Sequence, residues 1–346
     1  MATHLHGDEQ IIINRLLDQS VCGALPESSD SQAISTALSA IKKTAVQQRI
    51  NHYLKDLLGI APENYQENLV LLLGAELVEP ETVHVLLATL KAVLNIPELQ
   101  GNQDDRAVAT QTIIQRVHSE VVELDEKEIR KLISQLFVER FKLFVPDLPE
   151  YTLNDQEQEV EDYWDISPNF NLIAQSMINV FIRQETAVKN RAELTEVQQV
   201  NQALLTRRYL SRLEMPQLFA TLMAHKKEIA TAWAELNRYD LECGDDYALL
   251  LDHNRRPSQA KPTVVAIAVA QDIGVGIPER ELTDRIKLVA ARLLPDFAIS
   301  TSSVKEALRE FSLVTFENEF VSPTPIAQRF AAVVPTTKER EPDAIK

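Results

Sequence analysis

Acidic side chains are the first candidates for chemistry in this chain, because converging carboxylates can bind a catalytic metal ion. Asp240 and Glu242 alternate as they would on one face of a strand, yet no Glu-x-Lys completes the set that a metal-dependent nuclease requires. Asp245 and Asp246 are typical turn residues. No serine or cysteine has the surroundings of an activated nucleophile. The sequence therefore predicts a protein without catalytic residues.

Metal and cofactor sites are not indicated either. The seven histidines are scattered, and no His-x-x-x-His or Cys-x-x-Cys pair suggests zinc. Neither nucleotide-binding glycine signature is present, and the short Gly274-Val275-Gly276 motif, followed by Pro278, predicts a tight turn between helices. The two cysteines lie far apart in the sequence, which favours reduced thiols. We expect no metal and no cofactor.

Basic residues are the candidates for contact with nucleic acid. Lys305 and Arg309 are four residues apart and would share one face of a helix. The other candidates surround a predicted hairpin: Arg207, Arg208, Arg212, Lys226, Lys227, Arg255, Arg256 and Lys261. Three interpretations stay open for them: a solvated basic face, a patch that binds phosphate, or a surface that docks on an acidic protein.

Four glutamates indicate a protein-interaction surface in the last third of the chain. Glu306 and Glu310 lie on the helix that carries Lys305 and Arg309, and Glu317 and Glu319 flank the tip of the hairpin that follows. Carboxylates at this tip would be repelled by a phosphate backbone. We therefore expect this surface to contact protein rather than DNA.

Composition bounds the fold and the location. The 346 residues include only eight glycines and carry a net charge of −16, which opposes broad adsorption to nucleic acid or to anionic membranes. The first ten residues lack the features of a signal peptide, and no apolar run approaches the roughly 20 residues of a membrane span. We expect a mainly α-helical, cytoplasmic protein without a membrane partner. Association with the nucleoid stays open.

The chain divides into helical and mixed parts. Apolar residues at helical spacing, interrupted at Gly59, Pro80 and Pro97, predict about six helices and no strands in the first part. Two later hairpins, at residues 239–251 and 312–322, each follow predicted helices, as in a winged helix. No internal repeat of fixed period is visible. The predicted organisation is an all-α domain at 1–150, an acidic linker at 151–167, connecting helices at 168–213, winged-helix-like modules at 214–256 and 262–334, and a disordered tail at 335–346.

The residues from 215 to 330 resemble a known family. The segments LFATLMAHKKEIATAWAELNRYDLECGDDYALLL, VVAIAVAQDIGVGIPERELTDRI and TSSVKEALREFSLVTFENEFVSPTPIAQRF are similar to the tandem winged-helix subunits of bacterial condensins, the MukE-like and MksE-like proteins, and to the related subunit of Wadjet plasmid-defence complexes. This resemblance implies a non-catalytic accessory subunit that binds a kleisin and works with an SMC-type ATPase on DNA. Its setting would be chromosome maintenance and partitioning, or defence against plasmids or phage.

Other functions stay open at this point. The kleisin of such complexes, the MukF-like subunit, also contains a winged helix that ends on a Thr-Pro step, as Thr324-Pro325 does here. A stand-alone DNA-binding regulator is a further alternative, with the helical first part serving dimerisation or ligand sensing. The third alternative is an enzyme whose active site the sequence does not reveal. Whether the chain forms a homodimer is left open by the sequence.

Overall fold

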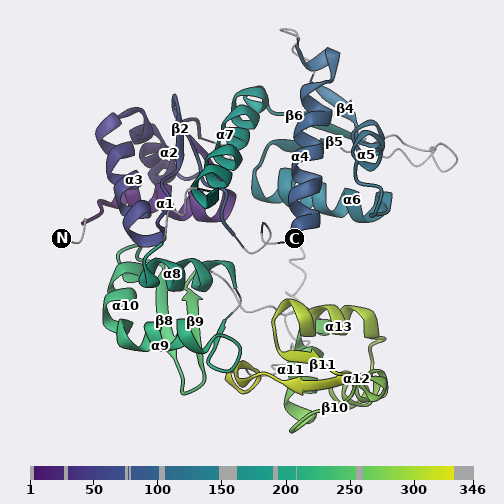
Figure 1. Ribbon diagram of the computed structural model, residues 1–346. Helices are drawn as coiled ribbons and strands as arrows, with labels where there is room; N and C mark the ends of the chain where they lie inside the picture. Colours follow the sequence, from purple (N-terminus) through teal and green to yellow (C-terminus); the bar gives the residue numbers. More distant parts are fainter. Residues whose placement is uncertain are drawn as a thin grey trace, which may run out of the picture. The chain divides into compact units, whose positions relative to one another are not determined.

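The computed structural model describes residues 4–26, 30–74, 77, 79–100, 106–147, 162–189, 194–207, 209–254 and 260–330. The chain is mainly helical and contains small three-stranded antiparallel sheets (Figure 1). Its contacts divide it into two compact units. Unit 1 comprises Met1–Arg207 and Thr221–Tyr239, and unit 2 comprises Arg208–Ala220 and Asp240–Lys346.

One order of elements occurs four times in the described part of the chain: a helix, a strand, two helices and a hairpin. The first block contains α1 (Gly7–Gln19), β1 (Val21–Gly23), α2 (Gln32–Ser39), η1 (Ala40–Lys42), α3 (Thr44–Leu58), β2 (Glu63–Tyr65) and β3 (Asn68–Val70). The second contains α4 (Pro80–Leu94), η3 (Pro97–Gln100), β4 (Ala107–Ala109), α5 (Thr110–His118), α6 (Glu126–Ile133), the π-helix η4 (Ser134–Arg140), β5 (Phe144–Asp147) and β6 (Tyr163–Ile166).

The third and fourth blocks follow the long helix α7 (Phe170–Lys189). The third contains α8 (Glu196–Thr206), β7 (Leu210–Ser211), α9 (Pro216–Ala224), α10 (Lys226–Ala234), β8 (Tyr239–Cys243) and β9 (Tyr247–Asp252). The fourth contains α11 (Lys261–Asp272), β10 (Ile277–Pro278), α12 (Glu279–Leu293), α13 (Thr301–Glu310), β11 (Val314–Glu317), β12 (Phe320–Pro323) and η5 (Pro325–Arg329).

The four sheets share one strand order. They read β1-β3-β2, β4-β6-β5, β7-β9-β8 and β10-β12-β11, so the last strand of each block always lies in the centre. The first strands begin at Val21, Ala107, Leu210 and Ile277, which are unequally spaced. The repetition is therefore one of topology without a fixed sequence period, and this is why the sequence showed no repeat.

Several expectations from the sequence need correction. Residues 1–150 are not all-α, because β1 to β5 lie within them, and β6 occupies Tyr163–Ile166 of the expected linker. The third block also begins with α8 and β7, before the expected boundary at 214. Most of the expected linker and the whole expected tail at 335–346 lie outside the described residues. The two expected hairpins are confirmed as β8–β9 and β11–β12.

An aromatic cluster holds the second block together in unit 1. Phe137 of the π-helix stacks on Phe144 with ring centroids 4.8 Å apart and meets Phe141 edge-on at 5.4 Å. Trp164 of β6 and Phe170 of α7 complete the cluster. Such rings contribute large apolar areas to a core. The cluster thus joins the π-helix, both hairpin strands and α7.

A buried arginine connects the second block to the first. Arg140, at the end of the π-helix, is 9% exposed, and its Nε donates to Ser20 Oγ at 2.9 Å. One Nη donates to the Leu73 carbonyl at 2.8 Å. A side chain at Gly74 would collide with this guanidinium. Glycine is therefore required at this position by the close approach of Arg140.

Within unit 1, side chains of α8 cap the carboxyl end of α3. The last carbonyls of a helix have no partner inside the helix and need other donors. Asn201 Nδ2 donates to the Leu57 carbonyl at 2.9 Å, and Gln202 Nε2 donates to that of Leu58 at 2.7 Å. Gln198 Nε2 reaches the carbonyls of Lys55 and Asp56. Asn201 also accepts from Trp233 Nε1 at 2.9 Å.

The first block caps α10 in the same way. Gln10 Nε2 donates to the Glu235 carbonyl at 2.7 Å, and Asn14 Nδ2 donates to that of Leu236 at 3.0 Å. The Tyr53 hydroxyl donates to the Ala232 carbonyl at 2.6 Å, and burial raises the pKa of this hydroxyl. Helix α8 of the third block therefore caps α3 of the first block, and the first block in turn caps α10 of the third.

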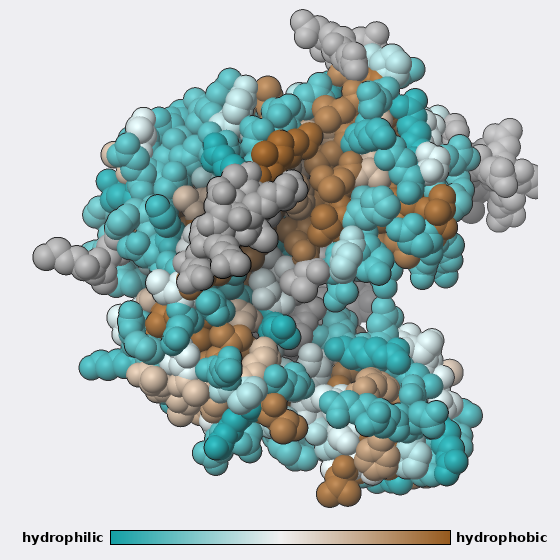
Figure 2. Space-filling model, viewed as in Figure 1, coloured by the Kyte–Doolittle hydropathy of each residue, from teal (hydrophilic) through white to brown (hydrophobic). Residues whose placement is uncertain are grey.

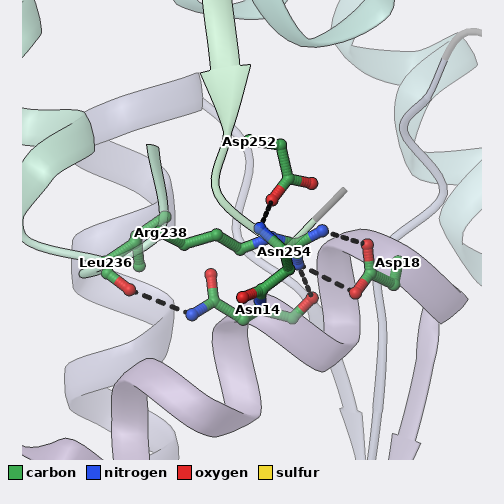
Figure 3. Close-up of polar contacts among 6 residues, drawn as sticks. All are labelled: Asn14, Asp18, Leu236, Arg238, Asp252 and Asn254. Atoms are coloured by element: carbon green, nitrogen blue, oxygen red, sulfur yellow. Dashed lines mark hydrogen bonds and ion pairs between the residues drawn. The ribbon is translucent and has the colours of Figure 1, made fainter. Parts of the chain in front are cut away.

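An ion pair reinforces this contact (Figure 3). Arg238, only 4% exposed, donates to both carboxylate oxygens of Asp18 at 2.7 and 2.8 Å and to the Asn14 carbonyl at 3.2 Å. Gln10, Asn14 and Asp18 are spaced four residues apart, so they form one polar stripe along α1. This stripe binds the turn that follows α10.

In unit 2, η5 joins the sheet of the third block to the fourth block. Ile326 is buried in an apolar cluster with Tyr209 and Leu249. Arg329 Nε donates to both carboxylate oxygens of Glu242 at 2.7 and 3.0 Å, and these hydrogen bonds hold the pKa of Glu242 below its usual value. A further apolar core lies between α11, α12 and α13.

None of the helices in the described part of the chain combines the length and the apolar character that crossing a membrane requires.

Candidate functional site

Helix α13 is a well-defined amphipathic helix. Ser300 caps it, because its Oγ accepts from the Ser303 backbone N–H at 3.3 Å. Val304, Ala307 and Leu308 are buried and face the core of the fourth block. This is the helix on which Lys305, Glu306, Arg309 and Glu310 were expected to lie.

The opposite face of α13 carries charges of both signs. Glu306, Arg309 and Glu310 are exposed, and Lys305 is partly buried. An open hollow runs along this face, lined by Ser302, Lys305, Glu306, Arg309 and Glu310. All of these residues belong to one helix, so the hollow is a surface groove rather than an enclosed pocket for a small molecule.

Two of the basic candidates in unit 2 lie over aromatic rings. The Arg309 guanidinium is 4.6 Å from the centroid of the Phe316 ring, and Lys261 Nζ is 3.1 Å from that of Phe297. Cation–π contacts at exposed sites contribute about 0.5–1 kcal/mol. The contact with Phe316, on the neighbouring strand β11, ties Arg309 to the hairpin and limits its reach toward a phosphate.

The β11–β12 hairpin carries the two other acidic candidates at its tip. Glu317 pairs with Phe320, and Asn318 and Glu319 form the two-residue connection with φ of 50° and 61°. Glu317 and Glu319 are both exposed. The base of the hairpin is fixed by Thr324, whose Oγ1 donates to the Ser312 carbonyl at 2.7 Å. The hairpin therefore presents two carboxylates to solvent on a rigid support.

The remaining basic candidates are distributed over both units. Arg207, Lys226 and Lys227 belong to unit 1, where all three are exposed. Arg212 belongs to unit 2 and pairs with Asp246 at 3.7 Å. Arg208, Arg255 and Arg256 lie outside the described residues. The structure thus places Lys305 and Arg309 on one helix, and the other described candidates belong to two different units.

Two apolar residues beside the hairpin were not among the sequence candidates. Val275 is 93% exposed and Phe320 is 40% exposed. On the face drawn in Figure 2, the broadest hydrophobic area lies over α4, so exposed apolar residues are not confined to the hairpin. The only sequence signal for Val275 is its position between two glycines, which predicted a tight turn and not exposure. The turn itself is confirmed by a hydrogen bond from the Gly276 N–H to the Ile273 carbonyl at 2.9 Å.

No metal site is found in the described residues, since they hold no group of three or more histidine, cysteine, aspartate or glutamate side chains that could ligate one ion. Neither Cys22 nor Cys243 forms a disulfide. The carboxylate with the most basic neighbours in the fourth block, Asp272, accepts hydrogen bonds from Arg292 at 3.0 Å and Arg285 at 2.9 Å. These bonds lower its pKa, and they connect α11 to α12 away from α13.

Comparison of the chain with known protein families, with curated proteins and with solved structures finds no match.

Proposed function

We propose that this chain is a non-catalytic scaffold subunit of four winged-helix modules, which binds a kleisin or an SMC-type ATPase in a DNA-associated complex. The observation that carries the proposal is the fourfold recurrence of one topology. A helix, a strand, two helices and a hairpin, with the last strand in the centre of the sheet, is the arrangement of a winged helix. In each block the third helix would be the recognition helix and the hairpin would be the wing.

Charge favours a protein partner over DNA. Residues 260–330 hold eight basic and nine acidic side chains, so the fourth block lacks the positive field that draws a protein onto a phosphate backbone. The acidic wing, with Glu317 and Glu319 exposed, would oppose such a contact. Its recognition helix, α13, presents Glu306 and Glu310 beside Lys305 and Arg309, a mixture that suits a polar protein interface.

The other recognition helices support the same interpretation. The carboxyl end of α3 is capped by Asn201 and Gln202, and that of α10 is capped by Asn14 and Tyr53. These contacts use the carboxyl ends of two of the proposed recognition helices to hold blocks of the same chain together, as expected of a scaffold.

Co-purification tests the proposal. The chain is co-expressed with the products of its neighbouring genes, and we expect a stable complex that contains a kleisin or an ATPase with a long coiled coil. Reversal of charge in the Glu317→Lys/Glu319→Lys variant should weaken this complex. The Asp284→Lys/Asp296→Lys variant is the matched control, since both of its exposed aspartates lie on or after α12. An intact complex with the first variant, accompanied by stronger DNA binding, would contradict the proposal.

One observation favours a DNA-binding regulator as the alternative. Lys226 and Lys227 are exposed in the first turn of α10, and their ammonium groups make no hydrogen bond or ion pair with the described residues. If the isolated chain bound duplex DNA with a steep dependence on salt, and the Arg207/Arg208/Arg212→Ala variant reduced that dependence, this alternative would replace the scaffold.

A further inference from the structure

We propose that the wing of the fourth block is the docking site for a partner segment that places an apolar side chain beside lysine or arginine. The site, called here the wing-tip surface, consists of Val275, Glu317, Glu319 and Phe320. The inference rests on the proposed function, because it names the chemistry by which the protein partner is recognised.

The four residues come together through a tight contact between a turn and the hairpin. Strand β10 pairs with β12, which places Pro278 opposite Phe320, and the Glu279 N–H donates to the Glu319 carbonyl at 2.8 Å. A Cβ atom at Gly276 would lie 2.5 Å from Phe320 Cε1 and 2.8 Å from the Val321 carbonyl oxygen. Only glycine permits this approach, and Gly276 also has φ of 121°. The turn that carries Val275 is therefore held beside Phe320.

The two apolar residues of the wing-tip surface, Val275 and Phe320, are exposed although the fold does not require it. Val275 stands between two glycines with positive φ and is 93% exposed, so it makes almost no contribution to the core. Phe320 keeps 40% of its surface exposed although it lies in the wing. An adjacent aliphatic and aromatic pair of this kind is suited to receive an apolar side chain of a partner.

Glu319 occupies a position where its residue type is unfavourable. A two-residue hairpin connection with positive φ at both positions strongly prefers Asn followed by Gly. Asn318 meets this preference, whereas Glu319, with φ of 61°, does not. Glu319 is exposed, and its carboxylate makes no hydrogen bond or ion pair with the described residues, so it is available to a partner.

The negative charge of the wing-tip surface determines which kind of partner segment it can bind. Glu317 lies directly across the hairpin from Phe320, so a carboxylate flanks the apolar pair on this strand and Glu319 flanks it at the tip. Phosphate would be repelled from both carboxylates, whereas lysine or arginine would be attracted. A protein segment that combines an apolar residue with neighbouring basic residues satisfies both features of the surface.

Three synthetic peptides of equal length test the inference on the full chain by fluorescence anisotropy. One alternates lysine with leucine, the second alternates lysine with serine, and the third alternates glutamate with leucine. We expect only the lysine–leucine peptide to bind well. Glu319→Gly should weaken this binding by about two- to fivefold, and Val275→Ser should weaken it by about tenfold. Asp284→Lys/Asp296→Lys, with its charges off the wing, should reduce it far less than Glu317→Lys/Glu319→Lys does.

Glu319→Gly also separates binding from folding. Because glycine relieves the strain at φ of 61°, this variant should melt at a higher temperature than the parent while binding less well. A higher melting temperature with unchanged binding would overturn the inference, as would equal affinity for the lysine–serine peptide. If a kleisin or ATPase co-purifies equally well with the parent, with Glu319→Gly and with Val275→Ser, the proposed function stands and this inference fails. If the peptide binds as expected but no such partner co-purifies, the inference stands and the proposed function fails.

Discussion

Replacement of Asn201 by alanine should destabilise unit 1 more than its small change in volume suggests. The side chain is 2% exposed, and it bridges the Trp233 indole N–H and the Leu57 carbonyl with two hydrogen bonds of 2.9 Å. Alanine would remove both bonds and leave a buried donor and a buried acceptor without this partner. Each such group costs about 1–3 kcal/mol, so we expect the free energy of unfolding to fall by about 2–5 kcal/mol.

Urea unfolding followed by tryptophan fluorescence measures this loss. The chain has two tryptophans, and a Trp164→Phe background carried by every variant leaves Trp233, which Asn201 contacts, as the reporter. Gln199→Ala is the matched control on the same helix. Gln199 is exposed, and among the described residues its side chain bonds only the nearby Leu194 carbonyl, so the loss for this control should stay within about 0.5 kcal/mol. A loss below about 1 kcal/mol for Asn201→Ala, or one equal to that of the control, would refute the reasoning.

Two further predictions concern the other polar contacts. Gly74→Ala should lower the free energy of unfolding by about 1–3 kcal/mol in a urea titration, because the new Cβ collides with the Arg140 guanidinium, whereas Gly7→Ala, with nothing within 4 Å, should not. Asp272 has a pKa below its ordinary value of 3.8. The stability that its ion pairs contribute is therefore present above that value and lost as the pH falls through the lower pKa of the folded state. Asp272→Asn should accordingly flatten the acid side of a plot of melting temperature against pH, and an unchanged acid side would contradict the assignment.

The helices and the last two hairpins were predictable because each has enough residues to show its period. In α13, Val304, Ala307 and Leu308 recur at helical spacing, and all three are buried. The hairpin expected at 312–322 is found as Val314–Glu317 and Phe320–Pro323. In both cases local pattern and tertiary packing agree, which is when sequence reasoning succeeds.

The first strand of each block was missed for a physical reason. Val21–Gly23 and Leu210–Ser211 contain three and two residues, which is too short for an alternation of period two to appear. They become strands because a hairpin much later in the chain supplies a central strand to pair with, as Val70 does for Val21. This pairing is a tertiary event, and it explains why the first part of the chain was taken for all-α and why the repeated topology was not recognised.

The charged residues of the wing-tip surface could be predicted from the sequence, whereas its apolar residues could not. Glu317 and Glu319 were expected to be exposed because they flank a predicted turn, and they are. Val275 and Phe320 carry no such signal, since an isolated apolar residue in a sequence is more often buried. The strain at Glu319 likewise became visible only with its φ of 61°. Exposure and backbone conformation of this kind depend on the pairing of β10 with β12.

The internal contacts of the first three blocks also explain why a partner would bind at the fourth. Capping by Asn201 holds the end of α3, capping by Asn14 holds the end of α10, and Arg140 at the end of the π-helix reaches Ser20. A partner that displaced any of these contacts would expose buried polar groups and destabilise the chain. Helix α13 packs on α11, α12 and β11 of its own block. Among the described residues, its outer face makes no comparable capping contacts with another block. A partner that bound α13 and its wing, as proposed, would therefore leave these internal contacts in place.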